Sequence, residues 1–178
     1  TGNRNEATTW QIGMLNSTQQ TQLGTRNETS STQWGNMNTA VQYQDGERND
    51  ASSFQWGNSN AATQIQLGQR NEASSTQVGD ENTLLQYQQG NDNSAANIQT
   101  GDNNIAAAFQ VGDDNMAMGT QTGDDNLLVQ LQIGNGNSAM NTQTGDGNLA
   151  AVSQSGDAHI HVGNQIGNNN SLMVNQSN

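Results

Sequence analysis

The chain has 178 residues, of which 30% are hydrophobic and 4% aromatic, and it contains no proline and no cysteine. Its formal charge of −12 disfavours nucleic acid and anionic membrane surfaces as partners, and the absence of cysteine excludes disulfides and thiolate metal sites. No stretch approaches 18 apolar residues, so no membrane insertion is expected. Asn occurs 28 times and Gln 24 times, and this composition taken alone is typical of a disordered, Asn/Gln-rich segment.

The positions of the amides contradict that interpretation. Glycine recurs every 11 residues from Gly2 to Gly167 without an insertion. Gln stands two residues before each following glycine, and Asn stands three residues after the glycine in 15 of 16 units, with His159 as the exception. The unit reads Q-x-G-x-x-N-x-A-x-x-x-Q, and a disordered chain has no physical reason to hold such a register.

Each unit predicts one strand of about six to seven residues, from the Asn to the Gln, followed by a tight turn at G-x-x. The strands are expected in chain order at 5–11, 16–22, 27–33 and onward in steps of 11 residues to 170–176. An 11-residue period is also that of a right-handed helical coiled coil. We set this aside because each unit carries a Gly, which costs about 1 kcal/mol in a helix interior, and because the apolar residues form no continuous seam.

A second period of 22 residues defines the fold. Arg occurs only at Arg4, Arg26, Arg48 and Arg70, and Gln recurs seven residues after the glycine in alternate units. We therefore expect an all-β protein, a cross-β solenoid of eight 22-residue coils with two strands per coil, in two parallel in-register sheets. Residues 1–178 are treated as one domain of sixteen 11-residue half-repeats.

The Asn and the Gln of one strand point to the same face, which we expect to be the interior, because side chains alternate along a strand. Stacked amides there would form ladders in which each side-chain N–H donates to the equivalent oxygen one coil away. The predicted Gln ladder is Gln11, Gln22, Gln33, Gln44, Gln55, Gln66, Gln77, Gln88, Gln99, Gln110, Gln121, Gln132, Gln143, Gln154 and Gln165. The predicted Asn ladder is Asn5, Asn16, Asn27, Asn38, Asn49, Asn60, Asn71, Asn82, Asn93, Asn104, Asn115, Asn126, Asn137, Asn148 and Asn170. The predicted turn glycines are Gly13, Gly24, Gly35, Gly46, Gly57, Gly68, Gly79, Gly90, Gly101, Gly112, Gly123, Gly134, Gly145, Gly156 and Gly167. The residues expected to point outward include Trp10, Trp34, Tyr43, Phe54, Trp56, Ile65, Tyr87, Phe109 and Leu131.

The repeat, for example Gln33-Trp34-Gly35-Asn36-Met37-Asn38-Thr39-Ala40, resembles the curlin repeat of curli subunits, from Gly2 to Gln176. The resemblance implies a secreted protein of the bacterial cell surface that polymerises into functional amyloid fibres of the biofilm matrix and serves adhesion. It also implies a nucleator subunit and a secretion pore as further partners. A signal peptide is expected to lie outside this chain.

The residues predict self-assembly independently of the resemblance. The repeat array shows no proline or other cap at its ends, so we expect copies to stack head to tail into an open filament. Stacked like charges repel, so assembly is expected to accelerate as the pH falls towards the pI of about 4.1 or as salt rises. The alternative is a monomeric solenoid that binds ice or carbohydrate.

Other features give weak signals. No motif indicates catalysis, and no cofactor is expected. Asp113, Asp114, Asp124 and Asp125 in the turns are weak calcium candidates, for which solvated turn residues are the favoured interpretation. His159 and His161 are weak metal candidates in a degenerate coil. The Arg column could bind a polyanion, but cross-strand charge compensation is favoured, beside the column of acids Glu6, Glu28, Asp50 and Glu72. Trp10, Trp34 and Trp56 could bind sugars, pack filaments side by side, or simply favour strands.

Overall fold

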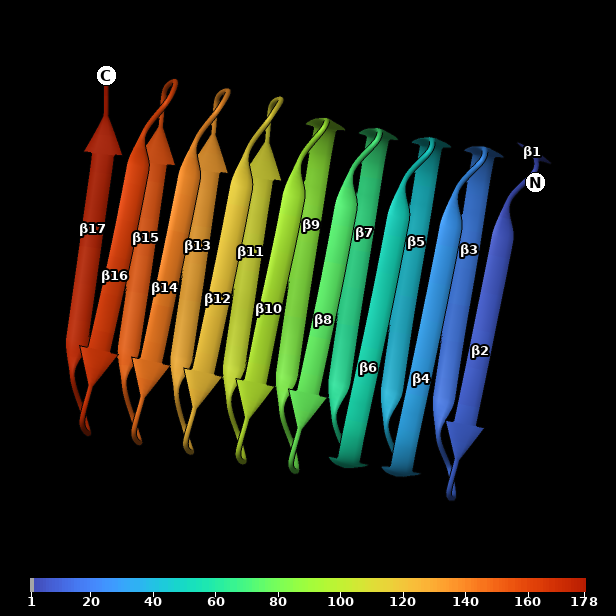
Figure 1. Ribbon diagram of the computed structural model, residues 1–178, viewed down its shortest axis with the longest axis horizontal. Coiled ribbons are helices and arrows are strands. Elements are labelled where there is room, and N and C mark those ends of the chain that lie inside the picture. The colour runs from blue at the N-terminus through green and yellow to red at the C-terminus, as the bar shows by residue number, and fades with distance from the viewer. Residues whose placement is uncertain (1) are drawn as a thin grey trace.

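The computed structural model describes residues 2–178, and these form strands and tight turns without any helix. The chain winds as a solenoid in which each coil gives one strand to each of two sheets, and the coils follow one another along the long axis (Figure 1). The nine-stranded sheet contains β1 (Gly2–Asn3), β3 (Ser17–Thr25), β5 (Thr39–Glu47), β7 (Ala61–Gln69), β9 (Thr83–Asn91), β11 (Ile105–Val111), β13 (Leu127–Ile133), β15 (Leu149–Ser155) and β17 (Ser171–Ser177). The eight-stranded sheet contains β2 (Glu6–Ile12), β4 (Glu28–Asn36), β6 (Asp50–Asn58), β8 (Glu72–Val78), β10 (Ser94–Thr100), β12 (Met116–Thr122), β14 (Ser138–Thr144) and β16 (Ile160–Ile166).

Every strand pairs in parallel with the strand one coil away, and the register joins each residue to the residue 22 positions later. Gln44 of β5 pairs with Gln66 of β7, and Ala51 of β6 pairs with Ala73 of β8. The predicted all-β solenoid with a 22-residue coil is therefore confirmed. A slip of one residue would turn every inward amide to the outside, so the alternation of the sequence fixes this register.

The turns depend on glycine because the coils approach closely there. Gly57 has φ +126, and a Cβ atom on it would lie 2.0 Å from the carbonyl oxygen of Gly79 in the next coil. The residue two positions after the glycine is left-handed as well, with φ 58 at both Met37 and Ser59. A left-handed non-glycine residue costs about 1–2 kcal/mol, so the backbone bonds of the turn must offset this strain.

The interior is built of amides and small residues. In β6, Ala51, Ser53 and Gln55 are buried, whereas the residues between them are partly exposed. Most of the buried apolar residues are alanines, and Leu84, Leu128 and Val152 are the larger exceptions. The buried residues of the described chain include no Asp, Glu, Arg or His. The predicted outward aromatics do lie outside, with Trp10 65% exposed, so the assignment of the two faces is confirmed.

Candidate functional site: the stacking faces of the coils

The Gln ladder runs without a break through the solenoid, and its bonds all point in one direction. Each Nε2 group donates to the Oε1 atom of the Gln 22 residues later, from Gln11 to Gln154 as donors, over 2.6 to 3.1 Å. A second proton goes to the opposite sheet, as where Gln55 donates to the Thr39 carbonyl oxygen at 2.9 Å. Because both protons of such an amide are used, a fully buried Gln costs little here.

The Asn ladder runs in the opposite direction and holds the turns. Asn60 donates through Nδ2 to Asn38 Oδ1, one coil earlier, at 3.1 Å, and its backbone N–H donates to the same oxygen at 3.0 Å. The second Nδ2 proton reaches forward to the Gly79 carbonyl oxygen at 2.7 Å. At His159 the ladder keeps only the backbone bond, to Asn137 Oδ1 at 3.0 Å. The Asn side chain therefore ties each turn to the turns before and after it.

These two ladders give every coil two different faces. The face towards the later coil presents Gln N–H donors and Asn Oδ1 acceptors, and the face towards the earlier coil presents Gln Oε1 acceptors and Asn N–H donors. Two such faces are complementary when coils follow head to tail. In a head-to-head contact Gln donors would meet Gln donors, and buried unpaired donors are costly, about 1–3 kcal/mol each.

A further Gln column was not among the predicted ladders. Gln20, Gln42 and Gln64 each donate to the next glutamine of the column along the nine-stranded sheet, over 2.8 to 2.9 Å, and Gln86 is the last acceptor. Their 22-residue period is visible in the sequence and could have identified them. The column is interrupted after Gln86 by Ala108, and Gln130, which follows, has no partner for its buried Oε1 atom.

The opposite sheet is irregular at the same level. Asn97 lacks partners for both polar atoms of its side chain and Asn141 lacks one for Nδ2, although both residues are buried. Between them, Gly119 leaves space that its neighbours fill, since a Cβ atom there would lie 2.3 Å from Asn97 Oδ1 and 2.4 Å from Leu128 Cδ2. The larger side chains of Asn97 and Leu128 thus fill the space that the missing side chain of Gly119 leaves in the interior.

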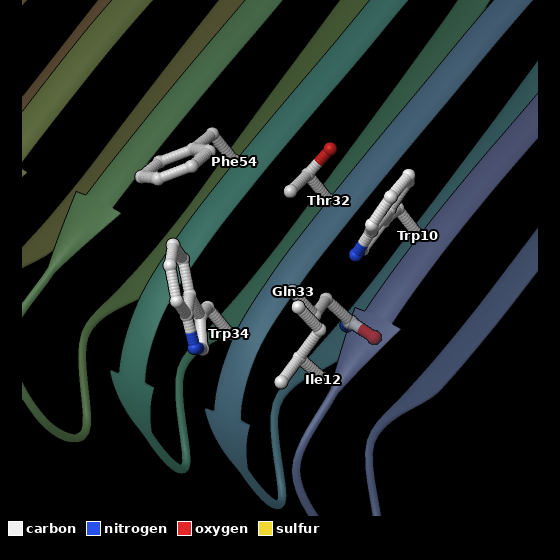
Figure 2. Close-up of a pocket in the computed structure, with 6 residues that line it drawn as sticks. All are labelled: Trp10, Ile12, Thr32, Gln33, Trp34 and Phe54. Carbon is white, nitrogen blue, oxygen red and sulfur yellow. The ribbon is translucent and has the colours of Figure 1, made fainter.

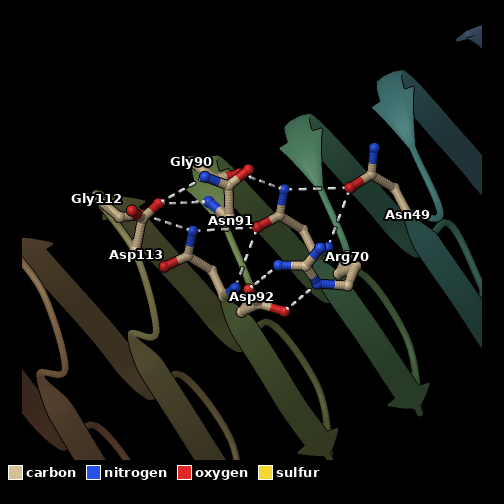
Figure 3. Close-up of polar contacts among 9 residues, drawn as sticks. Asn49, Arg70, Gly90, Asn91, Asp92, Gly112 and Asp113 are labelled. Carbon is tan, nitrogen blue, oxygen red and sulfur yellow. Dashed lines mark hydrogen bonds and ion pairs between the residues drawn. The ribbon is translucent and has the colours of Figure 1, made fainter.

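The turns carry the charges. Arg70 binds Asp92 through two hydrogen bonds, with Nε 2.6 Å from Oδ1 (Figure 3), and this contact holds the pKa of Asp92 below its ordinary value. Arg26 and Arg48 both approach Glu47, at 3.5 and 3.6 Å. Charge compensation across coils therefore occurs, but its acids are Glu47 and Asp92 and not the column Glu6, Glu28, Asp50 and Glu72. The arginines reach acids at the turns instead.

The acid column Glu6, Glu28, Asp50 and Glu72 stands without ion pairs among the residues the structure describes. Partial burial of the carboxyl group, followed by repulsion from Glu28 and Glu72, raises the pKa of Asp50. Repulsion is therefore built into the outer face of the eight-stranded sheet.

The weak metal candidates do not come together. Asp113 and Asp114 lie in the turn between β11 and β12, whereas Asp124 and Asp125 lie in the next turn, at the opposite edge. The two turns are roughly 20 Å apart, the length of a seven-residue strand. Asp113 Oδ1 accepts the Asn91 backbone N–H at 2.7 Å (Figure 3), so its role is in the turn. Within residues 2–178 no group of three His, Cys, Asp or Glu side chains is placed to hold a metal ion.

The two histidines point to different partners. His159 Nε2 lies 3.2 Å from the Ser155 carbonyl oxygen, and His161 Nε2 lies 3.0 Å from Asn141 Oδ1. His161 takes an inward position that alanine fills one coil earlier, at Ala139, and burial lowers its pKa. This arrangement suits a neutral imidazole in the interior.

The exposed tryptophans gather on the outer face of β2, β4 and β6. Trp34 and Trp56 stack with ring centroids 5.6 Å apart and planes inclined by 19°. Trp10, Thr32 and Phe54 are in register on the three strands, and with Ile12, Trp34 and Gln33 they border a groove of about 410 Å³ (Figure 2). Thr32 leaves a gap in a row that is otherwise aromatic.

Comparisons with family models and with curated proteins found no match to this chain. Residues 2–178 contain no helix that is long and apolar enough to cross a membrane.

Proposed function

We propose that the chain is a structural subunit of an extracellular, curli-like functional amyloid fibre, built by head-to-tail stacking of copies and serving the biofilm matrix and surface adhesion. The observation that carries the proposal is the repetition of one interface along the whole solenoid. A second copy placed on the axis would offer the same amide and backbone pattern that each coil already meets within the chain. Such a heterologous contact does not close and therefore produces fibres.

The chemistry of the interface favours self-association over other partners. The ladder bonds of the buried Gln and Asn side chains need an equivalent amide one coil away, as in stacked cross-β structures. A copy of this chain supplies those amides at every position of both sheets. The resemblance to the curlin repeat supports the same assignment and adds a secretion pore and a nucleator subunit to the proposed partners.

The test is to release purified protein from denaturant and follow thioflavin fluorescence and cryo-EM images. We expect unbranched fibres with a layer spacing of about 4.7–4.8 Å along the axis. Assembly should be faster near the pI of about 4.1 and at high salt than at neutral pH and low salt. Protein that stays monomeric at high concentration, without a thioflavin response, would contradict the proposal.

The aromatic groove favours a second candidate function, a monomeric carbohydrate-binding module. Exposed Trp10 and Trp34 and the partly exposed Phe54 around one groove provide the apolar surface on which sugar rings stack. Monomers that bind a glycan, with affinity lost on Trp34→Ala, would favour this candidate. Fibres would favour the first.

A further inference from the structure

Three of the six methionines lie together on the outer face of the eight-stranded sheet. Met116 and Met118 belong to β12, and Met140 of β14 is the in-register partner of Met118. The three side chains are 36%, 43% and 37% exposed. Residues two apart on a strand share a face, so all three thioethers project from the same side of the sheet.

The backbone places these thioethers within reach of a common point. Partners on neighbouring strands lie about 4.8 Å apart, and Met116 and Met118 are about 6.6 Å apart along β12. Ser94 and Ser138 flank Met116, while Ala96 precedes Met118 in the register. These small neighbours leave space, and an unbranched methionine side chain with three rotatable bonds can turn into it.

The ligand set selects the ion. Thioether sulfur is a soft ligand that prefers Cu(I), whereas Ca²⁺ and Mg²⁺ require oxygen and Zn²⁺ prefers imidazole or thiolate. Residues 89–178 carry eight acids and no arginine, so a negative field surrounds the patch and raises the local concentration of cations.

We propose that Met116, Met118 and Met140 form a surface site for one soft monovalent cation, Cu(I), held by three thioethers. The site is separate from the amide faces through which copies stack, so it does not depend on the proposed function. The other three methionines lack this arrangement. Met173, for example, is in register with Ala151.

The experiment titrates freshly purified, unassembled protein with Cu(I) under anaerobic conditions against a chromogenic Cu(I) chelator, and with Ag(I) as a redox-inert probe of the same chemistry. We expect one equivalent to bind. Methyl signals of ¹³C-methionine should shift for Met116, Met118 and Met140 and stay in place for the other three.

Two double variants separate the site from general thioether binding. Met118→Leu with Met140→Leu should weaken Cu(I) binding by about tenfold or more, because it removes two of three ligands. Met37→Leu with Met173→Leu removes the same number of exposed methionines and should leave the affinity unchanged. Equal affinities of the two variants, absence of binding by the native chain, or shifts at Met37 and Met173 would each overturn the proposal. Leucine is close in volume and all four positions are exposed, and an unchanged thermal unfolding midpoint verifies the fold.

Discussion

Gln64 and Gln130 occupy the same column of the nine-stranded sheet and offer a direct measurement of what an amide ladder contributes. Both are fully buried, and both donate to the backbone carbonyl groups 12 residues before and nine residues after them. They differ in one respect. Gln64 lies between two glutamines of the ladder, whereas Gln130 lies between Ala108 and Val152.

The perturbation is Gln64→Met compared with Gln130→Met, since methionine keeps the length of the side chain and removes its polar atoms. Each variant loses the same two backbone contacts. Gln64→Met also leaves Gln86 Oε1 buried without the donor that now lies at 2.9 Å, whereas Gln130→Met removes an oxygen that has no partner in the native protein. An unsatisfied buried group costs about 1–3 kcal/mol, so the two free energies of unfolding should differ by about 2–6 kcal/mol.

The assay is denaturant unfolding of the unassembled chain, followed by circular dichroism, with hydrogen exchange at β9 and β13 to localise the effect. We expect Gln64→Met to lower the midpoint markedly and Gln130→Met to change it little or to raise it. Changes that agree within about 0.5 kcal/mol would refute the reasoning, because that is the error expected for independent sites. The ladder bonds would then add nothing beyond the burial of the side chain.

Three further predictions follow from the turns and from the two shifted titrations. Gly57→Ala should abolish folding or cost about 4 kcal/mol or more, because its Cβ atom would meet the Gly79 carbonyl oxygen at 2.0 Å, whereas Gly136→Ala meets no atom within 4 Å and should cost only about 1–2 kcal/mol in thermal unfolding. The raised pKa of Asp50 means that the native state binds its proton at a higher pH than the unfolded chain does. Stability should therefore rise as the pH falls from above the raised pKa to the ordinary aspartate range, and Asp50→Asn should remove this gain in denaturant midpoints measured at several pH values. The lowered pKa of His161 has the opposite sign, because the unfolded chain is protonated first. Below about pH 6.5 the protection of the β16 amides, taken as the exchange rate relative to the intrinsic rate at each pH, should fall, and His161→Ala should abolish that loss of protection.

The sequence predicts most of the stacking site because the same physical demand recurs in every coil. The ladder bond of Gln55 requires an amide at the equivalent position one coil away. A fixed spacing of Gln is therefore sufficient to predict a buried ladder. The ion pairs could not be predicted in this way. Arg70 is left-handed, with φ 54, and its side chain reaches Asp92 at the equivalent turn position of the next coil and not Glu72 on the following strand. Spacing along the chain does not reveal that direction.

The direction of the hydrogen bonds in each ladder could not be predicted from the sequence either, since an amide can donate to the coil before it or to the coil after it. Gln55 donates forward and Asn60 donates backward, because each side chain has a different backbone carbonyl group within reach of its second proton. The backbone path of the turn settles this choice. The repeat therefore encodes the existence of the ladders, and the geometry of the turn gives them their polarity.

The irregular layers of the interior solve a problem that uniform repeats create. If all coils were identical, one part of the chain could slip past another by a whole coil and regain every amide bond. The layer at Gly119 opposes a slip of one coil, because Asn97 and Leu128 fill the space above it and would collide with Asn141, the residue one coil later in this column. Gly163, two coils later, has the same kind of neighbours in Asn141 and Leu172. The unsatisfied atoms of Asn97 and Gln130 are the cost in stability. The regular columns keep the faces compatible between copies, while the irregular layers oppose a one-coil slip within each copy.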